Sequence, residues 1–370
     1  MTPTPPNHAL QRTRPSRCCC NRGVPRPGVV ELGSLGGGGR PMKDFFKRVA
    51  LALCSGYIIV YYGEFVFWAT PEREGLDVGG IIGVWLAYSV MAYPFLCVAS
   101  LFKVRDPWAV FLAGAFYGWF EEGIVVQTMF GTDDGPFPAS ISFTGLAWHA
   151  LLDIWIGWYL MRRVLAQNNY SKTIALTCAI GIIYGFWAIF WWNEPPPPMK
   201  ALLNAGAKDV LLIHFALFAF GTTLPLVLAH WLYNRVGLTE FKPSQVELWI
   251  LGVLVLLYYA FITVPAAPKA LWVLPPLMGV TFWALSKNRR AETRPDAIVA
   301  FTEKVKPLNY LLLFLIPLVA IAIYFLALAN DARVPTNRII YVITTPLGAL
   351  LWLIGVVMCF RPNRVRNLTA

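Results

Sequence analysis

The chain has 370 residues, of which 57% are hydrophobic, 15% aromatic and only 14% charged, and its mean hydropathy is +0.56. This balance excludes an ordinary soluble globular domain and indicates a polytopic membrane protein. The formal net charge of +11 at pH 7 requires no nucleic-acid partner, because a basic tail and basic loops facing anionic lipids explain it.

The first part of the chain differs from the rest in composition. Residues 1–41 are rich in Pro, Gly and Arg, lack an apolar stretch long enough for a signal peptide, and are predicted to be a disordered tail. Met42, in "PMKDFFKRVALAL", would give an alternative start, so that the tail need not be translated. We predict a six-helix membrane core over 42–235 and a four-helix accessory membrane bundle over 236–370.

Ten apolar runs follow the tail, each close to the ~20 residues that a helical span requires. A run such as "LNYLLLFLIPLVAIAIYFLALA" is apolar on all sides instead of alternating, which excludes barrel strands and predicts an all-α transmembrane helical bundle. The predicted spans are Arg48–Trp68, Val78–Phe102, Trp108–Phe130, Ala139–Met161, Ile174–Trp192, Val210–Tyr233, Leu248–Val264, Ala270–Leu285, Leu308–Ala329 and Ile339–Phe360.

Charge in the short loops predicts the orientation of these spans. The basic loops are "MKDFFKR", "KVR", "MRRVLAQNNYSK", "SKNRRAETRPD" and "RPNRVRN", whereas "EREGLD" and "TDDG" are acidic. Because Lys and Arg are enriched in cytoplasmic loops, both termini are predicted to be cytoplasmic. We expect a multi-pass protein of the inner membrane of a bacterium, with membrane lipids as its surroundings.

Several ionisable residues lie at similar depth in the predicted membrane. Glu121 and Glu122, in "YGWFEEGIVVQTMF", place Glu122 roughly 12 Å below the outer boundary, and His149 lies about 15 Å deep on the next span. Asp153 follows His149 by four residues and shares its helix face. His214, in "DVLLIHFALF", lies roughly 8 Å deep. Such groups favour a functional site, and a paired helix-helix contact is the structural alternative.

A glutamate with two histidines can activate water in two ways. A buried carboxylate can act as general base while histidines stabilise an oxyanion, or His149, His214 and Glu122 can hold a zinc ion. The zinc motif HExxH is absent from the sequence. The cofactor therefore stays open between zinc and none.

Three segments, "FEEGIVVQTMF", "GLAWHALLD" and "LPLVLAHWLYN", resemble the motifs of the CAAX-protease and bacteriocin-processing (CPBP) family of intramembrane endopeptidases. The resemblance implies that Glu121 and Glu122 are the paired acids, one of them the water-activating base. It also implies that His149 is the histidine of the second motif. The third motif would be His230 with Asn234, or "HALLD" itself. A peptide or protein in the membrane would be the substrate.

From these residues we expect Glu122 to be the base, Glu121 its partner, and His149 a ligand or oxyanion donor that Asp153 orients. His214 or His230 would complete the site, and depth favours His214. The same Glu122 and His149 could instead form the relay of a proton-coupled transporter or a small-molecule-binding membrane protein. In a third class, a scaffolding protein, the polar layer would be structural. Glu64, close to the outer end of the first span, is interpreted as a residue that faces interfacial water; the alternative is that it lines the same cavity as Glu122.

Overall fold

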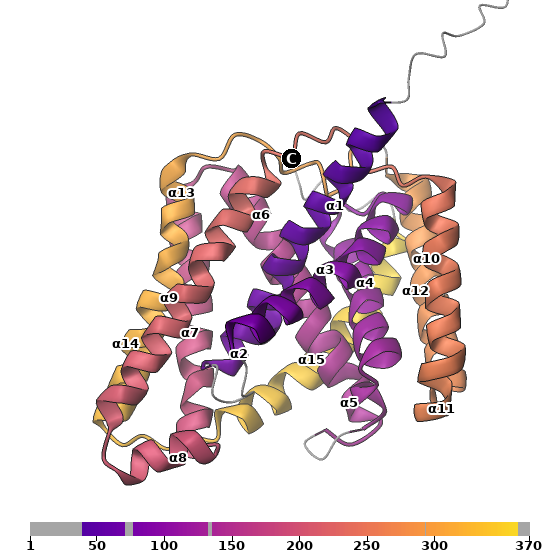
Figure 1. The fold of residues 1–370 in the computed structure, drawn as a ribbon. Helices are drawn as coiled ribbons and strands as arrows, with labels where there is room; N and C mark the ends of the chain where they lie inside the picture. The colour runs from indigo at the N-terminus through magenta and orange to yellow at the C-terminus, as the bar shows by residue number, and fades with distance from the viewer. Residues whose placement is uncertain (1–38, 71–76, 132–134, 293, 362–370) are drawn as a thin grey trace, which may run out of the picture. The chain divides into compact units, whose positions relative to one another are not determined.

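The structure, a computed structural model, describes residues 39–70, 77–131, 135–292 and 294–361. All regular structure in these ranges is helical (Figure 1), which confirms the predicted all-α class. The predicted tail lies outside the described residues except for 39–41, which begin the first helix. The described residues from Arg40 onward form one compact unit, and a boundary at residue 235 stays a prediction.

The helices follow one another with short connections. Those of the first half are α1 (Gly39–Val60), η1 (Tyr61–Phe65), α2 (Val66–Trp68), α3 (Val78–Leu101), α4 (Pro107–Trp119), η3 (Phe120–Val125), η4 (Thr128–Phe130), α5 (Ala139–Ser142), η5 (Phe143–Met161), α6 (Arg162–Ala166) and α7 (Tyr170–Asn193). Those of the second half are α8 (Pro197–Asn204), α9 (Lys208–Tyr233), α10 (Gln245–Tyr258), η6 (Tyr259–Thr263), α11 (Val264–Ala266), α12 (Ala270–Ala291), α13 (Pro307–Leu311), η7 (Leu312–Phe314), α14 (Leu315–Ala329) and α15 (Thr336–Cys359).

Eight continuous helices in the described part of the chain are long and apolar enough to cross a membrane, and they correspond to eight of the ten predicted spans. They are Met42–Trp68, Val78–Leu101, Ala139–Ala166, Tyr170–Asn193, Lys208–Tyr233, Gln245–Ala266, Pro307–Ala329 and Thr336–Cys359. The other two predicted spans correspond to α4 with η3, where two glutamates lower the hydropathy, and to α12, which ends in basic residues. The eight helices indicate an integral membrane protein, and the number of ten spans stays a prediction.

Polar caps fix where several of these helices begin. The side chains of Asp77, Asp106, Asn169 and Ser244 each accept a hydrogen bond from a backbone N–H two or three residues further on. Such caps satisfy N–H groups that the first turn of a helix leaves without intrahelical partners. The helix starts are therefore encoded locally, next to the apolar runs.

Several predicted cytoplasmic loops meet at one end of the helices. Lys47 donates to the carbonyl of Gly237, which joins the start of the first span to the loop after α9. Arg105 donates to the carbonyl of Pro295, which joins the loop after α3 to the loop after α12. These contacts agree with the predicted alternation of loops, whereas the cytoplasmic side itself stays a prediction.

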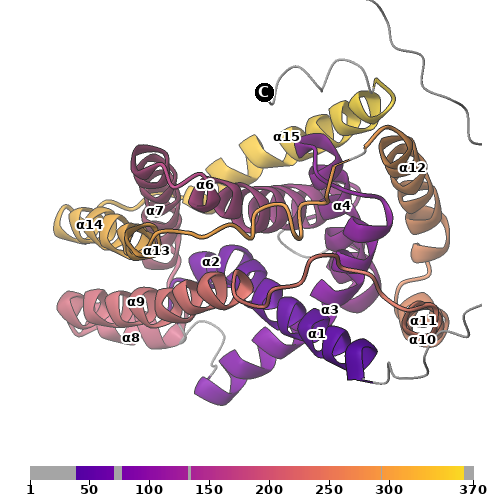
Figure 2. The same ribbon diagram turned by 90° about the horizontal axis from the view of Figure 1, so that it is seen from above.

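Burial differs strongly among the spans. In Met42–Trp68, 78% of the most apolar window is buried inside the protein, against 6% in Gln245–Ala266. In both views α10 lies at an edge of the described helices (Figures 1 and 2), and large apolar side chains such as Trp249 and Phe261 are exposed. In a bilayer these side chains would contact lipid.

The helices α4 and η5 approach each other closely through glycines. A Cβ atom on Gly118 would overlap the backbone carbonyl of Gly145, and one on Gly145 would lie 2.6 Å from the ring of Trp119. A Cβ on Gly114 would lie 3.0 Å from the Cα of Ala150. Small residues let helix backbones pack tightly in membranes, and here they bring the acid-bearing segment next to the segment of His149.

We expect Gly118→Ala to destabilise the protein by about 1–3 kcal/mol, because its Cβ would force α4 away from η5. Gly221→Ala is the matched control, since a Cβ at this helical glycine would have no atom within 4 Å. Thermal unfolding in detergent measures both. A midpoint for Gly118→Ala equal to that of Gly221→Ala would contradict the close packing.

Candidate functional site

Four of the ionisable residues of the predicted polar layer lie in π-helical segments, whereas His214 lies in the α-helix α9. Glu121 and Glu122 lie in η3, and His149 and Asp153 lie in η5. Glu64 lies in a third segment of this kind, η1. In η3 the bond from Val126 N–H to the carbonyl of Glu121, 2.8 Å, spans five residues. π-Helical turns are uncommon and often mark functional sites.

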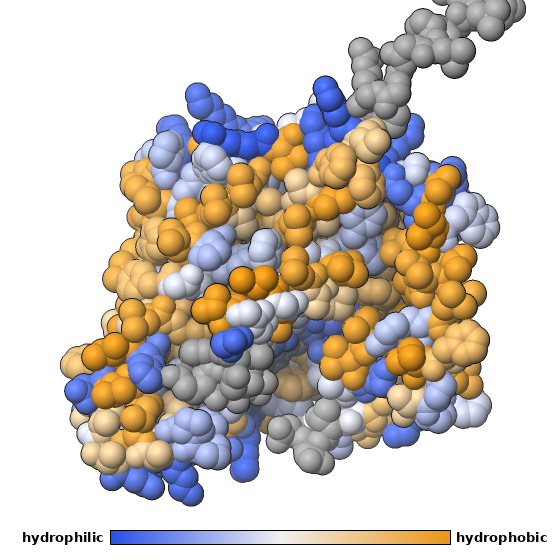
Figure 3. Space-filling model, in the orientation of Figure 1, coloured by the Kyte–Doolittle hydropathy of each residue, from blue (hydrophilic) through white to orange (hydrophobic). Residues whose placement is uncertain are grey.

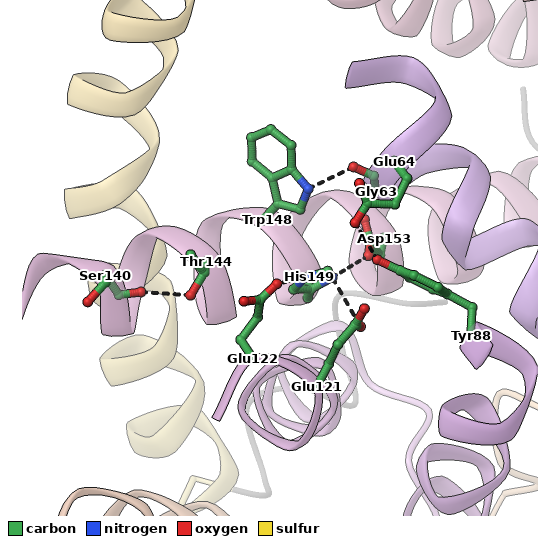
Figure 4. A network of polar contacts seen from close by, with 10 residues as sticks. All are labelled: Gly63, Glu64, Tyr88, Glu121, Glu122, Ser140, Thr144, Trp148, His149 and Asp153. Atoms are coloured by element: carbon green, nitrogen blue, oxygen red, sulfur yellow. Dashed lines mark hydrogen bonds and ion pairs between the residues drawn. The ribbon is translucent and has the colours of Figure 1, made fainter. Parts of the chain in front are cut away.

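His149 is the centre of a cluster of carboxyl groups (Figure 4). Its Nδ1 lies 2.7 Å from Asp153 Oδ2, and its Nε2 lies 2.8 Å from Glu122 Oε1. Glu121 Oε2 lies 3.4 Å from the same Nδ1. Four residues that the sequence analysis selected are thus brought together, and both ring nitrogens of His149 are engaged by acids.

Two further polar residues, Tyr88 and Glu64, lie beside this cluster. Tyr88 donates a hydrogen bond of 2.6 Å to Glu64, and Glu64 interacts electrostatically with His149 and Asp153. Glu64 therefore lies beside the cluster, in place of the interfacial role that the sequence favoured. Sequence reasoning did not select Tyr88, because a tyrosine within an apolar run gives no signal of its partner.

The backbone of η1 closes the cluster on one side. Trp148 donates from Nε1 to the carbonyl of Gly63, at 2.7 Å (Figure 4). A Cβ on Gly63 would lie 2.5 Å from Asp153 Oδ2, so only glycine leaves room for this carboxyl group. Gly63 is a further residue of the site that the sequence did not reveal, although it directly precedes Glu64.

Glu122 is the member of the cluster that solvent or a ligand can reach. The side chains of His149 and Asp153 are fully buried and that of Glu121 is 3% exposed, whereas that of Glu122 is 13% exposed. Within the described residues, three carboxyl oxygens of the cluster have no hydrogen-bond partner: Glu121 Oε2, Glu122 Oε2 and Asp153 Oδ1. Buried carboxylate oxygens normally have partners, so these atoms leave hydrogen-bonding capacity unused inside the cluster.

The two bonds of His149 require a mobile proton. A neutral imidazole has a single N–H, so with Asp153 and Glu122 both on its nitrogens either one acid carries a proton or the imidazole is charged. The proton can thus reside on Glu122 or on His149 without a change in heavy-atom positions. The arrangement can therefore accept and release a proton, which is the capacity needed for acid–base chemistry.

The end of η3 is held by residues from the second half of the chain. Thr263, in η6, donates 2.6 Å to the carbonyl of Ile124, and Tyr258, in α10, donates 3.2 Å to the carbonyl of Val125. Carbonyls at the end of a helix lack intrahelical partners, and these two hydroxyl groups supply them. The position of Glu121 and Glu122 therefore depends on α10 and η6.

The remaining predicted site residues lie on or directly after α9, a helix that packs against α14 and η1. His214 is half-buried in its first half. His230 is buried near the other end, where Arg162 acts on it electrostatically. Asn234, which follows α9, donates to the hydroxyl of Tyr310 at 2.8 Å. Whether His214 or His230 completes the site stays a prediction.

The cluster does not have the geometry of the zinc site considered from the sequence. Zinc–nitrogen and zinc–oxygen bonds of about 2.0–2.2 Å at tetrahedral angles place two ligand atoms ~3.3 Å apart, whereas His149 Nε2 and Glu122 Oε1 are 2.8 Å apart. Among the described residues, no group of three or more His, Cys, Asp or Glu forms a metal-holding set. In this structure His149 and Glu122 form a hydrogen-bonded acid–base pair, and zinc as a cofactor stays a prediction.

A double-mutant cycle tests the contact between His149 and Asp153. We expect the stability effects of His149→Ala and Asp153→Ala to be non-additive by about 1 kcal/mol or more, because each change leaves the other side chain buried without its partner. Thermal unfolding of the two single variants and the double variant measures this coupling. The cycle of His230→Ala with Asp153→Ala is the control and should be additive. Additivity in the first cycle would contradict the contact.

Comparison with known proteins adds no relative to this description. No family model, no curated protein and no solved structure matches the chain. The resemblance to the CPBP family therefore stays a prediction from the three sequence segments.

Proposed function

We propose that this integral membrane protein is an intramembrane hydrolase, an endopeptidase of the CPBP type, with a peptide or protein in the membrane as its substrate. The observation that carries the proposal is the row Asp153–His149–Glu122, with contacts of 2.7 and 2.8 Å. An acid that orients an imidazole, which in turn contacts a second reactive group, is the logic of the hydrolytic triads.

In the proposed reaction, Glu122 takes a proton from a water molecule while the oxygen of that water attacks the carbonyl carbon of the scissile bond. Glu122 has one oxygen on His149 and one without a protein partner, so it can contact both groups. His149, through its contact with Glu122, can hold the proton, and Glu122 delivers it to the leaving nitrogen when the C–N bond breaks. Asp153 holds the ring in position and stabilises the imidazolium, as the orienting acid of a triad does.

The membrane setting is part of the same proposal. The protein would be a ten-span protein of a bacterial inner membrane, and the loop charges support its orientation with both termini in the cytoplasm. Burial of the cluster among apolar helices strengthens its electrostatic interactions, because the local dielectric constant is low. Membrane lipids are the expected partners of its exposed apolar helices.

A proton-coupled transporter or small-molecule-binding protein is the second candidate. The observation that favours it is the number of acids around one imidazole, since Glu64, Glu121, Glu122 and Asp153 all act on His149. Like charges so close together are not all ionised at once, so the cluster stores protons. Carboxyl and imidazole groups at membrane depth are typical of proton relays.

Cleavage of a peptide library by the full chain in detergent tests the hydrolase. We expect Glu122→Gln and His149→Ala to reduce cleavage by at least about 100-fold, the scale on which positioned acid–base groups act. Glu303→Gln is the matched control, because Glu303 is exposed and the substitution is chemically the same. Mass spectrometry of the products measures the rates.

The outcome also separates the two candidates. Cleavage by the unmodified protein that persists in Glu122→Gln would contradict the hydrolase mechanism. The carrier would gain support if the unmodified protein cleaved nothing but moved a proton with a solute into vesicles, and if Glu122→Gln alone abolished that movement.

A further inference from the structure

A second polar site lies away from the His149 cluster, beside the short helix α8. It is a pocket of about 560 Å³, and its lining includes Trp192, Glu194, Lys200, Lys208 and Arg333. Figure 3 shows hydrophilic side chains gathered at this end of the described helices. None of these residues contributes to the proposed hydrolase.

The pocket lies at one end of four of the helices that are long and apolar enough to cross a membrane. These helices end or begin at Asn193, Lys208, Ala329 and Thr336, and the pocket residues are at these ends or in the adjoining loops. Trp192 Nε1 donates to the carbonyl of Ala332 at 2.9 Å, which fixes the indole against the loop after α14. Trp at the ends of spans is typical of the level of the lipid headgroups.

The charge of the pocket is predominantly positive. Its lining contains the three cationic residues Lys200, Lys208 and Arg333 and the single acid Glu194. Asp331 partly balances the cations from one side, since it lies 3.3 Å from Lys208 Nζ and 3.8 Å from Arg333. The longer of these distances exceeds a hydrogen bond, so the guanidinium donors of Arg333 stay available to a ligand.

Both cations contact Trp192 and share Asp331 as a neighbour. Lys208 Nζ and the guanidinium carbon of Arg333 each lie 4.9 Å from the centre of a Trp192 ring. Lys208 also donates to the carbonyl of Leu328 at 3.3 Å. Cation–π contacts reduce the freedom of long side chains at little cost to their charge, which leaves a prepared pair of donors in a concave site.

From these features we infer that the pocket beside α8 binds a phosphate group, with Lys208 and Arg333 as its donors. Guanidinium and ammonium groups bind phosphate oxygens through charge-assisted hydrogen bonds, and a planar guanidinium does so with two parallel bonds. At the level of the lipid headgroups, the phosphate belongs to a phospholipid or to a soluble phosphate compound. The experiment below distinguishes these two sources.

Native mass spectrometry of the full chain in detergent measures binding directly. Phosphatidylglycerol provides the lipid phosphate, diacylglycerol is the lipid without phosphate, and inorganic phosphate is the soluble probe. We expect Lys208→Gln and Arg333→Gln each to weaken phosphate-dependent binding about tenfold or more, the scale of one charge-assisted hydrogen bond. Arg333→Lys, which keeps the charge, should weaken it less.

Lys269→Gln is the matched control, because Lys269 has the same kinds of contact outside the pocket. Its Nζ lies 4.7 Å from the ring of Phe137 and 3.5 Å from the carbonyl of Phe130. Binding of phosphatidylglycerol that Lys269→Gln preserves and both pocket variants weaken would support a lipid ligand. The same pattern with inorganic phosphate alone would support a soluble one.

Other results would overturn the inference. One is equal binding of phosphatidylglycerol and diacylglycerol by the unmodified protein, with no binding of inorganic phosphate. Another is phosphate-dependent binding that neither pocket variant changes. If the pocket variants do not fold, a phospholipid with a photoreactive headgroup can be cross-linked to the unmodified protein. Labelling found only outside residues 192–208 and 331–333 would then overturn the inference as well.

Discussion

The close approach of α4 to η5 is the constraint on which the candidate site depends. Glycines on both helices remove the side chains that would otherwise keep the backbones apart. Without this approach, Glu122 could not lie 2.8 Å from His149, and Asp153, on its own helix, would be the close acidic partner left to His149. An unpaired ionisable group inside a membrane is costly. The close packing of small residues therefore also provides the electrostatic pairing of the cluster.

Much of the fold could be predicted from the sequence because the membrane imposes a simple requirement. Apolar runs such as Leu308–Ala329 leave the backbone no hydrogen-bond partners except its own, and a helix satisfies them all. The run containing Glu121 and Glu122 differs from such apolar runs. Its acids lower the hydropathy of a helix that packs in the protein interior. Hydropathy measures transfer into lipid, whereas this segment is surrounded mainly by other helices.

The site could be predicted only in part, for a similar reason. The spacing of His149 and Asp153 on one helix and the similar depth of Glu122 were visible in the sequence. The contributions of Tyr88 and Gly63 were not, because they arise from helix pairs that no local pattern specifies. The π-helical register was also hidden, since side-chain periodicity in an apolar run does not distinguish it from an ordinary helix.

Helix α15 packs directly on the helix of His149: a Cβ on Gly348 would lie 2.9 Å from the backbone nitrogen of Ala147, and Ser142 donates to the carbonyl of Thr345. Membrane helices are inserted in the order of synthesis, so the segments carrying the acids and the imidazole enter the bilayer well before α15. The packing around the helix of His149 is therefore completed late, when α15, the last helix of the described residues, arrives. Until then, the helix of His149 lacks part of its final packing, although all the acids that contact the imidazole are already synthesised.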